Sequence, residues 1–125
     1  MNEVLEKELV DLARRLPAKD DSKNLDRIRH AFANGHLVIL RVGNDILGYA
    51  EVYRMKEIPS YPVIPYPVDD IDGDILYCFA AVCNPGFVKD LIKLGFDTFS
   101  TVNSIVYHRR KHGNKVYKIV RDKNV

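Results

Sequence analysis

The chain has 125 residues, of which 46% are hydrophobic and 29% are charged, and its formal net charge is +2. This length has room for one domain, residues 1–125. The composition excludes a disordered chain, which would have fewer apolar residues and a larger net charge. The weak positive charge does not by itself indicate a nucleic-acid or membrane partner.

Two amphipathic helices are predicted at the N-terminal end. The apolar positions of the first helix are Leu5, Leu9, Leu12 and Leu16. Pro17 should stop this helix, and the next should start at about Asn24 and end at Asn34-Gly35. The packing face of the second helix should consist of Leu25, Ile28 and Phe32. Charged residues interrupt the first sixteen positions, so we expect neither a signal peptide nor a membrane span.

A β-hairpin and a proline-rich loop should follow. His36 to Met55 contains two runs typical of strands, joined by the turn Gly43-Asn44-Asp45. Ile58–Pro67 contains four prolines, which forbid a regular helix or a central strand. We expect this loop to border a ligand cleft, with Tyr61 and Tyr66 as its aromatic walls.

The most continuously apolar run, Ile75–Cys83, should be the central strand, buried on both faces. Asn84-Pro85-Gly86 then opens a helix over Phe87–Phe99. The packing stripe of this helix should consist of Val88, Leu91, Ile92 and Phe96. The expected strands are 36–42, 46–55, 75–83, 104–110 and 115–120. The predicted fold class is therefore α/β (α+β), with the element order ααββ-loop-βαββ and a mixed, mostly antiparallel sheet flanked by helices.

The two cysteines, Cys78 and Cys83, are separated by an odd number of positions along the same strand. This spacing should place them on opposite faces, where they cannot form a disulfide with each other. Reduced thiols are typical of a cytoplasmic protein. Cysteines and histidines do not cluster at zinc-ligand spacing, so we expect no metal site.

The predicted order resembles the GNAT (GCN5-related N-acetyltransferase) fold. VILRVGNDILGYAEVYRM is similar to the second and third strands of the family. GDILYCFAAVC is similar to its fourth strand, and NPGFVKDLIKLGF stands where the family has the helix that binds pyrophosphate. The loop Asn84–Leu91 departs from the Q/R-x-x-G-x-G/A motif of the family.

This resemblance implies a site for acetyl-CoA as cosubstrate, between the fourth strand and the following helix. The free N–H groups and the positive dipole end of a helix N-terminus can bind phosphate. The residues expected to bind the cosubstrate are Phe79, Ala80, Ala81, Val82, Gly86, Phe87, Val88 and Lys89. A plain strand-to-helix connection is the alternative interpretation.

Two residues are candidates for catalysis of acyl transfer. Glu51 lies within a predicted strand and shares a face with Tyr49 and Tyr53, which would raise its pKa and suit a general base. Tyr107, on the strand after the predicted helix, is the candidate acid for the leaving thiolate. Each residue also has a structural alternative, as a solvent-facing or packing side chain. His108, beside three cationic residues, is interpreted as solvated charge.

The sequence therefore predicts an N-acyltransferase that moves an acetyl group from acetyl-CoA to an unidentified amine. The alternatives are a non-catalytic GNAT-like interaction module, of the kind encoded by phages or mobile elements, or a small nucleic-acid binder. The latter would use the basic hairpin 107–118, in which Tyr107 and Tyr117 are interleaved with cations. These cations are Arg109, Arg110, Lys111, Lys115 and Lys118. A charged edge hairpin that resists aggregation is a further alternative for the same segment.

Overall fold

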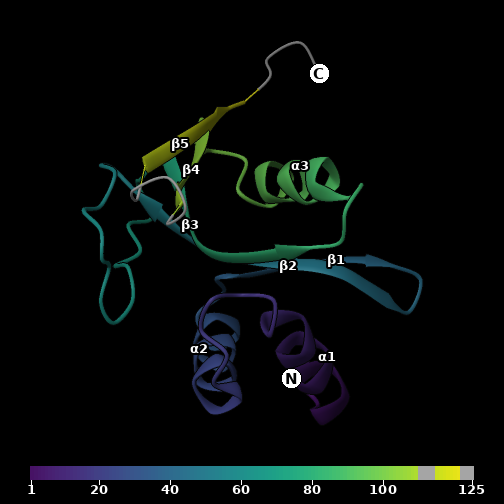
Figure 1. The fold of residues 1–125 in the computed structure, drawn as a ribbon. Coiled ribbons are helices and arrows are strands. Elements are labelled where there is room, and N and C mark those ends of the chain that lie inside the picture. The colour runs from purple at the N-terminus through teal and green to yellow at the C-terminus, as the bar shows by residue number, and fades with distance from the viewer. Residues whose placement is uncertain (110–114, 122–125) are drawn as a thin grey trace.

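Five strands form one mixed sheet in the order β1-β2-β3-β4-β5 in the computed structural model, which describes residues 1–109 and 115–121 (Figure 1). The strands are β1 (Leu37–Val42), β2 (Asp45–Met55), β3 (Ile75–Cys83), β4 (Ser104–Arg109) and β5 (Lys115–Val120). Neighbouring strands are antiparallel except β3 and β4, which are parallel. The predicted element order and sheet type are confirmed, and β3 is the middle strand of the five.

Helices cover both faces of this sheet (Figure 1). The helices α1 (Glu3–Ala13) and α2 (Asp21–Ala33) pack on one face, and α3 (Val88–Thr98) packs on the other. We call these the α1/α2 face and the α3 face. The core of the α3 face includes Val38, Val52, Leu76, Phe96 and Ile105. The core of the α1/α2 face includes Leu9, Leu12, Ile28, Tyr49 and Val82.

The two N-terminal helices differ from their predicted bounds. The first helix ends at Ala13, before Pro17, because the N–H groups of Arg15 and Leu16 bond three residues back and tighten the last turn. The second helix begins earlier than predicted, because the side chain of Asp20 accepts a bond from the Lys23 N–H and caps it. Its buried residues are Asn24, Ile28 and Ala31. The prediction that Phe32 packs was wrong, since that side chain is 46% exposed.

A β-bulge in β3 changes which side chains share a face. Glu51 pairs with Ala80 and Val52 pairs with Cys78, so Phe79 is an extra residue without a partner on β2. The alternation of side chains shifts by one position beyond the bulge. Cys78 and Cys83 consequently both pack on the α3 face, and the prediction of opposite faces was wrong.

The loop and the third helix largely follow the sequence. Residues 58–67 form no strand, as predicted from their prolines. The loop continues to Asp69, whose carboxylate accepts a bond from the backbone N–H of Arg54 at 2.7 Å and thereby joins the loop to β2. Leu91 and Phe96 of α3 are buried, whereas Val88, predicted to pack, is 51% exposed because it lies at the open start of the helix.

Candidate functional site

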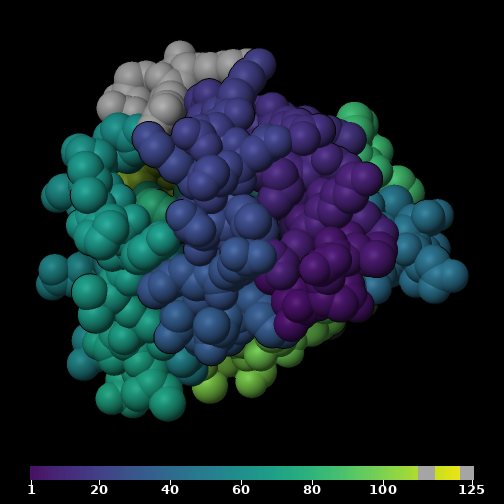
Figure 2. All heavy atoms as spheres, turned by 90° about the horizontal axis from the view of Figure 1, so that it is seen from below, coloured from purple at the N-terminus to yellow at the C-terminus, as the bar shows by residue number. Residues whose placement is uncertain are grey.

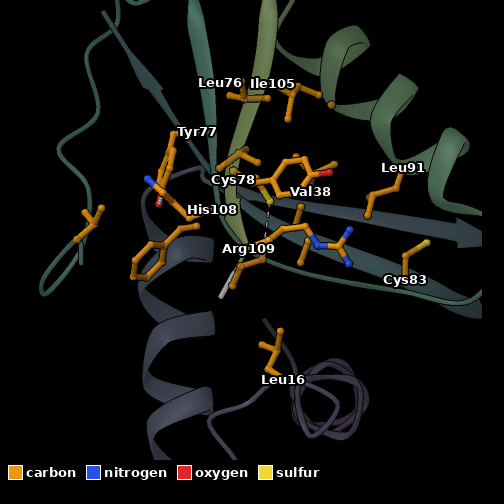
Figure 3. Close-up of a pocket in the computed structure, with 18 of the residues that line it drawn as sticks. Leu16, Val38, Leu76, Tyr77, Cys78, Cys83, Leu91, Ile105, His108 and Arg109 are labelled. Carbon is orange, nitrogen blue, oxygen red and sulfur yellow. Dashed lines mark hydrogen bonds between the residues drawn. The ribbon is translucent and has the colours of Figure 1, made fainter. Parts of the chain in front are cut away.

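A cavity opens where β3 and β4 separate. These parallel strands pair only through Ile75–Tyr77 and Ser104–Val106. Beyond Tyr77, among the residues that the structure describes, the edge of β3 that faces β4 has no strand partner. The resulting cavity has a volume of about 940 Å³ and is lined mainly by apolar side chains from β3, β4, α3 and the proline-rich loop (Figure 3). We call it the interstrand cavity.

The interstrand cavity is lined from both faces of the sheet. On the α3 face its walls are Leu91, Ile92, Gly95, Ile105 and Ile119. On the α1/α2 face its walls are Leu16, Pro17, Ala18 and Arg27, together with 61–64 of the loop. Seen from the α1/α2 face, the surface is hollowed between the loop and the α1–α2 segment, and atoms of the later strands are visible inside (Figure 2). This hollow gives a ligand access to the cavity from the α1/α2 face.

The N-terminus of α3 adjoins this cavity and has no side-chain cap. Phe87 occupies the N-cap position without a side-chain hydrogen bond, and the N–H of Leu91 bonds to the carbonyl of Phe87. The N–H groups of the first turn before Leu91 therefore have no partner within the helix. Gly86 precedes them with a φ of 89° and open space around its Cα. Such a terminus can bind an anion, although the carboxylate of Asp90 in the first turn opposes this.

The residues predicted to bind the cosubstrate fall into three groups. Phe79, Ala80, Ala81 and Val88 line the interstrand cavity. Gly86, Phe87 and Lys89 are exposed at the adjacent turn, outside the cavity wall. Val82 faces away from both, because beyond the bulge its side chain is buried against α1 on the α1/α2 face.

Tyr107 lines the interstrand cavity from β4. Its ring stacks on the ring of Tyr117 across the β4–β5 pair, with ring centroids 5.5 Å apart and planes 13° apart. This stacking fixes the direction of the Tyr107 side chain.

Glu51 is fully buried and lies behind the cavity wall. Both carboxylate oxygens accept bonds from Nε of Arg27, at 2.7 and 3.0 Å, and Nη1 of Arg27 donates to Asn24 at 2.8 Å. Burial raises the pKa of the Glu51 carboxyl, and the charge of Arg27 opposes this rise. Of this pair only Arg27 lines the interstrand cavity. Glu51 does share a face with Tyr49 and Tyr53, both almost completely buried.

Sequence reasoning missed His108, which was interpreted as solvated charge. Its imidazole lines the interstrand cavity, and Nδ1 lies 2.8 Å from the hydroxyl oxygen of Tyr77 on β3 (Figure 3). Of the two predicted aromatic walls, Tyr61 lines the cavity and its ring lies 5.5 Å from that of His108. Tyr66 instead stacks on His30 of α2 with ring centroids 3.9 Å apart.

The basic hairpin is described only in part. Its residues 110–114 lie outside the described residues, and with them Arg110 and Lys111 of the predicted cationic cluster. Within the described part, Arg109 and Lys115 both contact the face of Tyr117. Within residues 1–109 and 115–121 there is no group of three potential metal ligands. The same residues form no helix that is long and apolar enough to cross a membrane.

Comparison with known proteins identifies the fold. No protein-family model matches this sequence, and no curated protein matches it. The GphF GNAT-like decarboxylase in complex with isobutyryl-CoA aligns with a TM-score of 0.61 at 14% identity, over 86% of this chain and 63% of its own. The protein PH1933 from Pyrococcus horikoshii OT3 aligns with a TM-score of 0.56 at 11% identity, over 90% and 76% of the two chains.

A GNAT family acetyltransferase from Brucella melitensis in complex with acetyl-CoA aligns with a TM-score of 0.55 at 11% identity, over 98% of this chain and 85% of its own. These likenesses confirm the predicted GNAT-like fold. The chain spans 63% of the length of the GphF protein.

Proposed function

We propose that this protein binds an acyl-CoA thioester in the interstrand cavity and transfers the acyl group to an amine. The observation that carries the proposal is the separation of β3 from β4 beside an uncapped helix N-terminus. The solved proteins that share the fold include one bound to isobutyryl-CoA and one bound to acetyl-CoA. Both complexes support an acyl-CoA as the ligand class here.

The chain offers each part of an acyl-CoA a suitable environment. The unpaired edge of β3 along Phe79–Ala81 can hydrogen-bond an amide-containing arm in the way that a further strand would. The pyrophosphate would lie at the N-terminus of α3, near Gly86, Phe87 and Val88, with Lys89 as a nearby cation. The apolar wall of the cavity would exclude water from the thioester.

Tyr107 is the proposed acid for the leaving thiolate, because it lines the cavity on the strand opposite β3. We propose an indirect role for Glu51. Its carboxylate is occupied by Arg27 and buried, so it orients the Arg27 side chain that lines the cavity rather than contacting a substrate.

The second candidate function is a non-catalytic GNAT-like interaction module. It is favoured by the departure of Asn84–Leu91 from the glycine motif of the family and by the carboxylate of Asp90 at the proposed pyrophosphate site. Both features weaken phosphate binding.

Calorimetric titration with acetyl-CoA distinguishes these two functions. We expect wild-type protein to bind, and Gly86→Glu to weaken binding at least about tenfold by placing a second carboxylate beside the phosphates. Gly86→Gln is the matched control, because it carries the same backbone strain at a positive φ without the charge. Absence of wild-type binding at millimolar acetyl-CoA would reject the acyltransferase and favour the module.

A further inference from the structure

His108 and Tyr77 meet at the point where the two parallel strands begin to separate. Tyr77 is the last residue of β3 that pairs with β4, and its side chain is 3% exposed. His108 lies two positions beyond the last paired residue of β4 and is half-buried against the cavity (Figure 3). Its ring is therefore placed by β4, by the Tyr77 hydroxyl and by the adjacent ring of Tyr61.

The contact with Tyr77 is made by Nδ1 of His108 and does not involve Nε2. When Nδ1 carries the proton, it donates to the Tyr77 oxygen at 2.8 Å, and Nε2 keeps a free lone pair. Burial raises the pKa of Tyr77 to about 12, so its hydroxyl stays protonated and neutral. An imidazole held in this way can act as a general base through the Nε2 lone pair.

The alternation of β4 separates His108 from Tyr107. Tyr107 faces the side of α3, with Ile105 and Ile119, whereas His108 faces the loop and the α1/α2 face with Tyr61 and Tyr77. The two residues thus line opposite halves of one cavity. Tyr107 lies in the half next to the proposed CoA site, and His108 lies in the half through which an acceptor would enter.

The charges of the cavity wall limit which amines can bind as the acceptor. Among the described residues that line it, the fixed charges are those of Arg27 and Arg109, and none is a carboxylate. Most other wall residues near His108 are apolar or aromatic, such as Pro62, Val63 and Phe79. Arg27 is already paired with Glu51, so the uncompensated charge among these lining residues is that of Arg109. A polyamine or a lysine-rich peptide would bring further positive charge to a wall that has no carboxylate to pair with it.

We propose that His108 is the general base of this site, positioned by Tyr77, and that its acceptor is a small amine with an apolar or aromatic body and no second positive charge. This inference rests on the proposed function. In the reaction the amine nitrogen forms a bond to the thioester carbonyl carbon and loses a proton to Nε2 of His108. The carbon–sulfur bond breaks, the sulfur takes a proton from Tyr107, and the products are an amide and free CoA thiol.

The test measures thiol release from acetyl-CoA with two matched amines. Phenethylamine carries one charge, and 4-(2-aminoethyl)benzylamine adds a second at the far end of the ring. We expect wild-type protein to prefer phenethylamine. His108→Gln, which keeps a polar partner for Tyr77, should lower kcat about 100-fold or more, while acetyl-CoA affinity in the calorimeter stays unchanged.

Two further variants separate catalysis from structure. Added imidazole should restore turnover to His108→Ala, since it can enter the space left by the ring, which a merely structural role would not permit. Tyr77→Phe should lower kcat less than His108→Gln and leave KM for acetyl-CoA unchanged, because it removes only the group that orients the imidazole.

Unchanged kcat in His108→Gln would overturn the role of His108, and preference for the diamine would overturn the acceptor class. Binding of acetyl-CoA without acylation of either amine would overturn this inference and leave the binding site standing. Failure of acetyl-CoA to bind would overturn the proposed function and this inference with it.

Discussion

The buried ion pair between Arg27 and Glu51 gives a stability prediction that does not depend on function. The side chain of Glu51 is 0% exposed and that of Arg27 is 15% exposed, with 2.7 Å between Nε and Oε2. Arg27→Met removes the charge that compensates the carboxylate and leaves Glu51 buried. Breaking a buried pair in this way costs about 3–5 kcal/mol, a large share of the roughly 5–15 kcal/mol that stabilises a typical domain.

The double variant Arg27→Met/Glu51→Leu is the control. It removes both charges, so the uncompensated carboxylate is absent and stability should recover to within about 1–2 kcal/mol of wild type. The remaining cost comes from Asn24, whose side-chain oxygen loses its bond from Arg27. Urea unfolding followed by circular dichroism measures all three free energies of unfolding.

The pH dependence of Arg27→Met follows from the direction of the Glu51 pKa. Burial already raises this pKa above its ordinary value of 4.5, and removing Arg27 removes the opposing effect. A folded-state pKa above the unfolded value means that the folded protein binds more protons, so stability falls as pH rises from about 4.5 to the folded pKa. The slope in this window approaches about 1.4 kcal/mol per pH unit. Arg27→Met should therefore be closer to wild type at pH 5 than at pH 8. Equal losses at both pH values, or a double variant as unstable as the single one, would refute this reasoning.

Two further predictions concern single positions. Val82→Asp should unfold the domain, because the side chain of Val82 is buried on the α1/α2 face. Ala81→Asp should fold and weaken acetyl-CoA binding, because Ala81 is exposed and lines the interstrand cavity. Thermal melts and calorimetry check this pair, and equal stability of the two variants would contradict the assigned faces. Gly73→Ala should be strongly destabilising, since an added Cβ would lie 2.5–2.7 Å from backbone atoms of Met55, whereas Gly86→Ala has open space and should cost only about 1 kcal/mol of backbone strain. A similar loss in both variants, measured by urea unfolding, would show that the close approach at Gly73 relaxes.

The fold could be predicted because its signals are local. The apolar run of β3, the turn of the β1–β2 hairpin and the prolines of the loop each specify their own segment, and the structure confirms all three. The start of α2 differs from the prediction, because Asp20 caps the helix and it begins before Asn24.

The β-bulge at Phe79 could not be predicted, because no glycine or proline marks it and the strand around it is uniformly apolar. Regular alternation from Cys78 would place Val82 on the α3 face and Cys83 on the α1/α2 face. The extra residue exchanges the two positions. The interactions of the candidate site were also hidden, because they join distant residues. Glu51 meets Arg27 across 24 positions, and His108 meets Tyr77 across 31. Alternation alone places Tyr107 and His108 on opposite faces, but only the separation of β3 from β4 brings both to one cavity.

The short parallel pairing of β3 with β4 also has a consequence for how the molecule unfolds. Three residue pairs join the β4–β5 hairpin to the rest of the sheet. Arg121, which follows β5, also ties the hairpin to α3 and to the segment before β4. Its side chain donates to the carbonyl oxygens of Val102, Phe96 and Phe99. Releasing the hairpin would break few backbone hydrogen bonds between strands, while β1, β2 and β3 kept theirs. Such a partial opening costs less free energy than global unfolding, so the backbone amides of β5 belong to a less protected cooperative unit than those of β2.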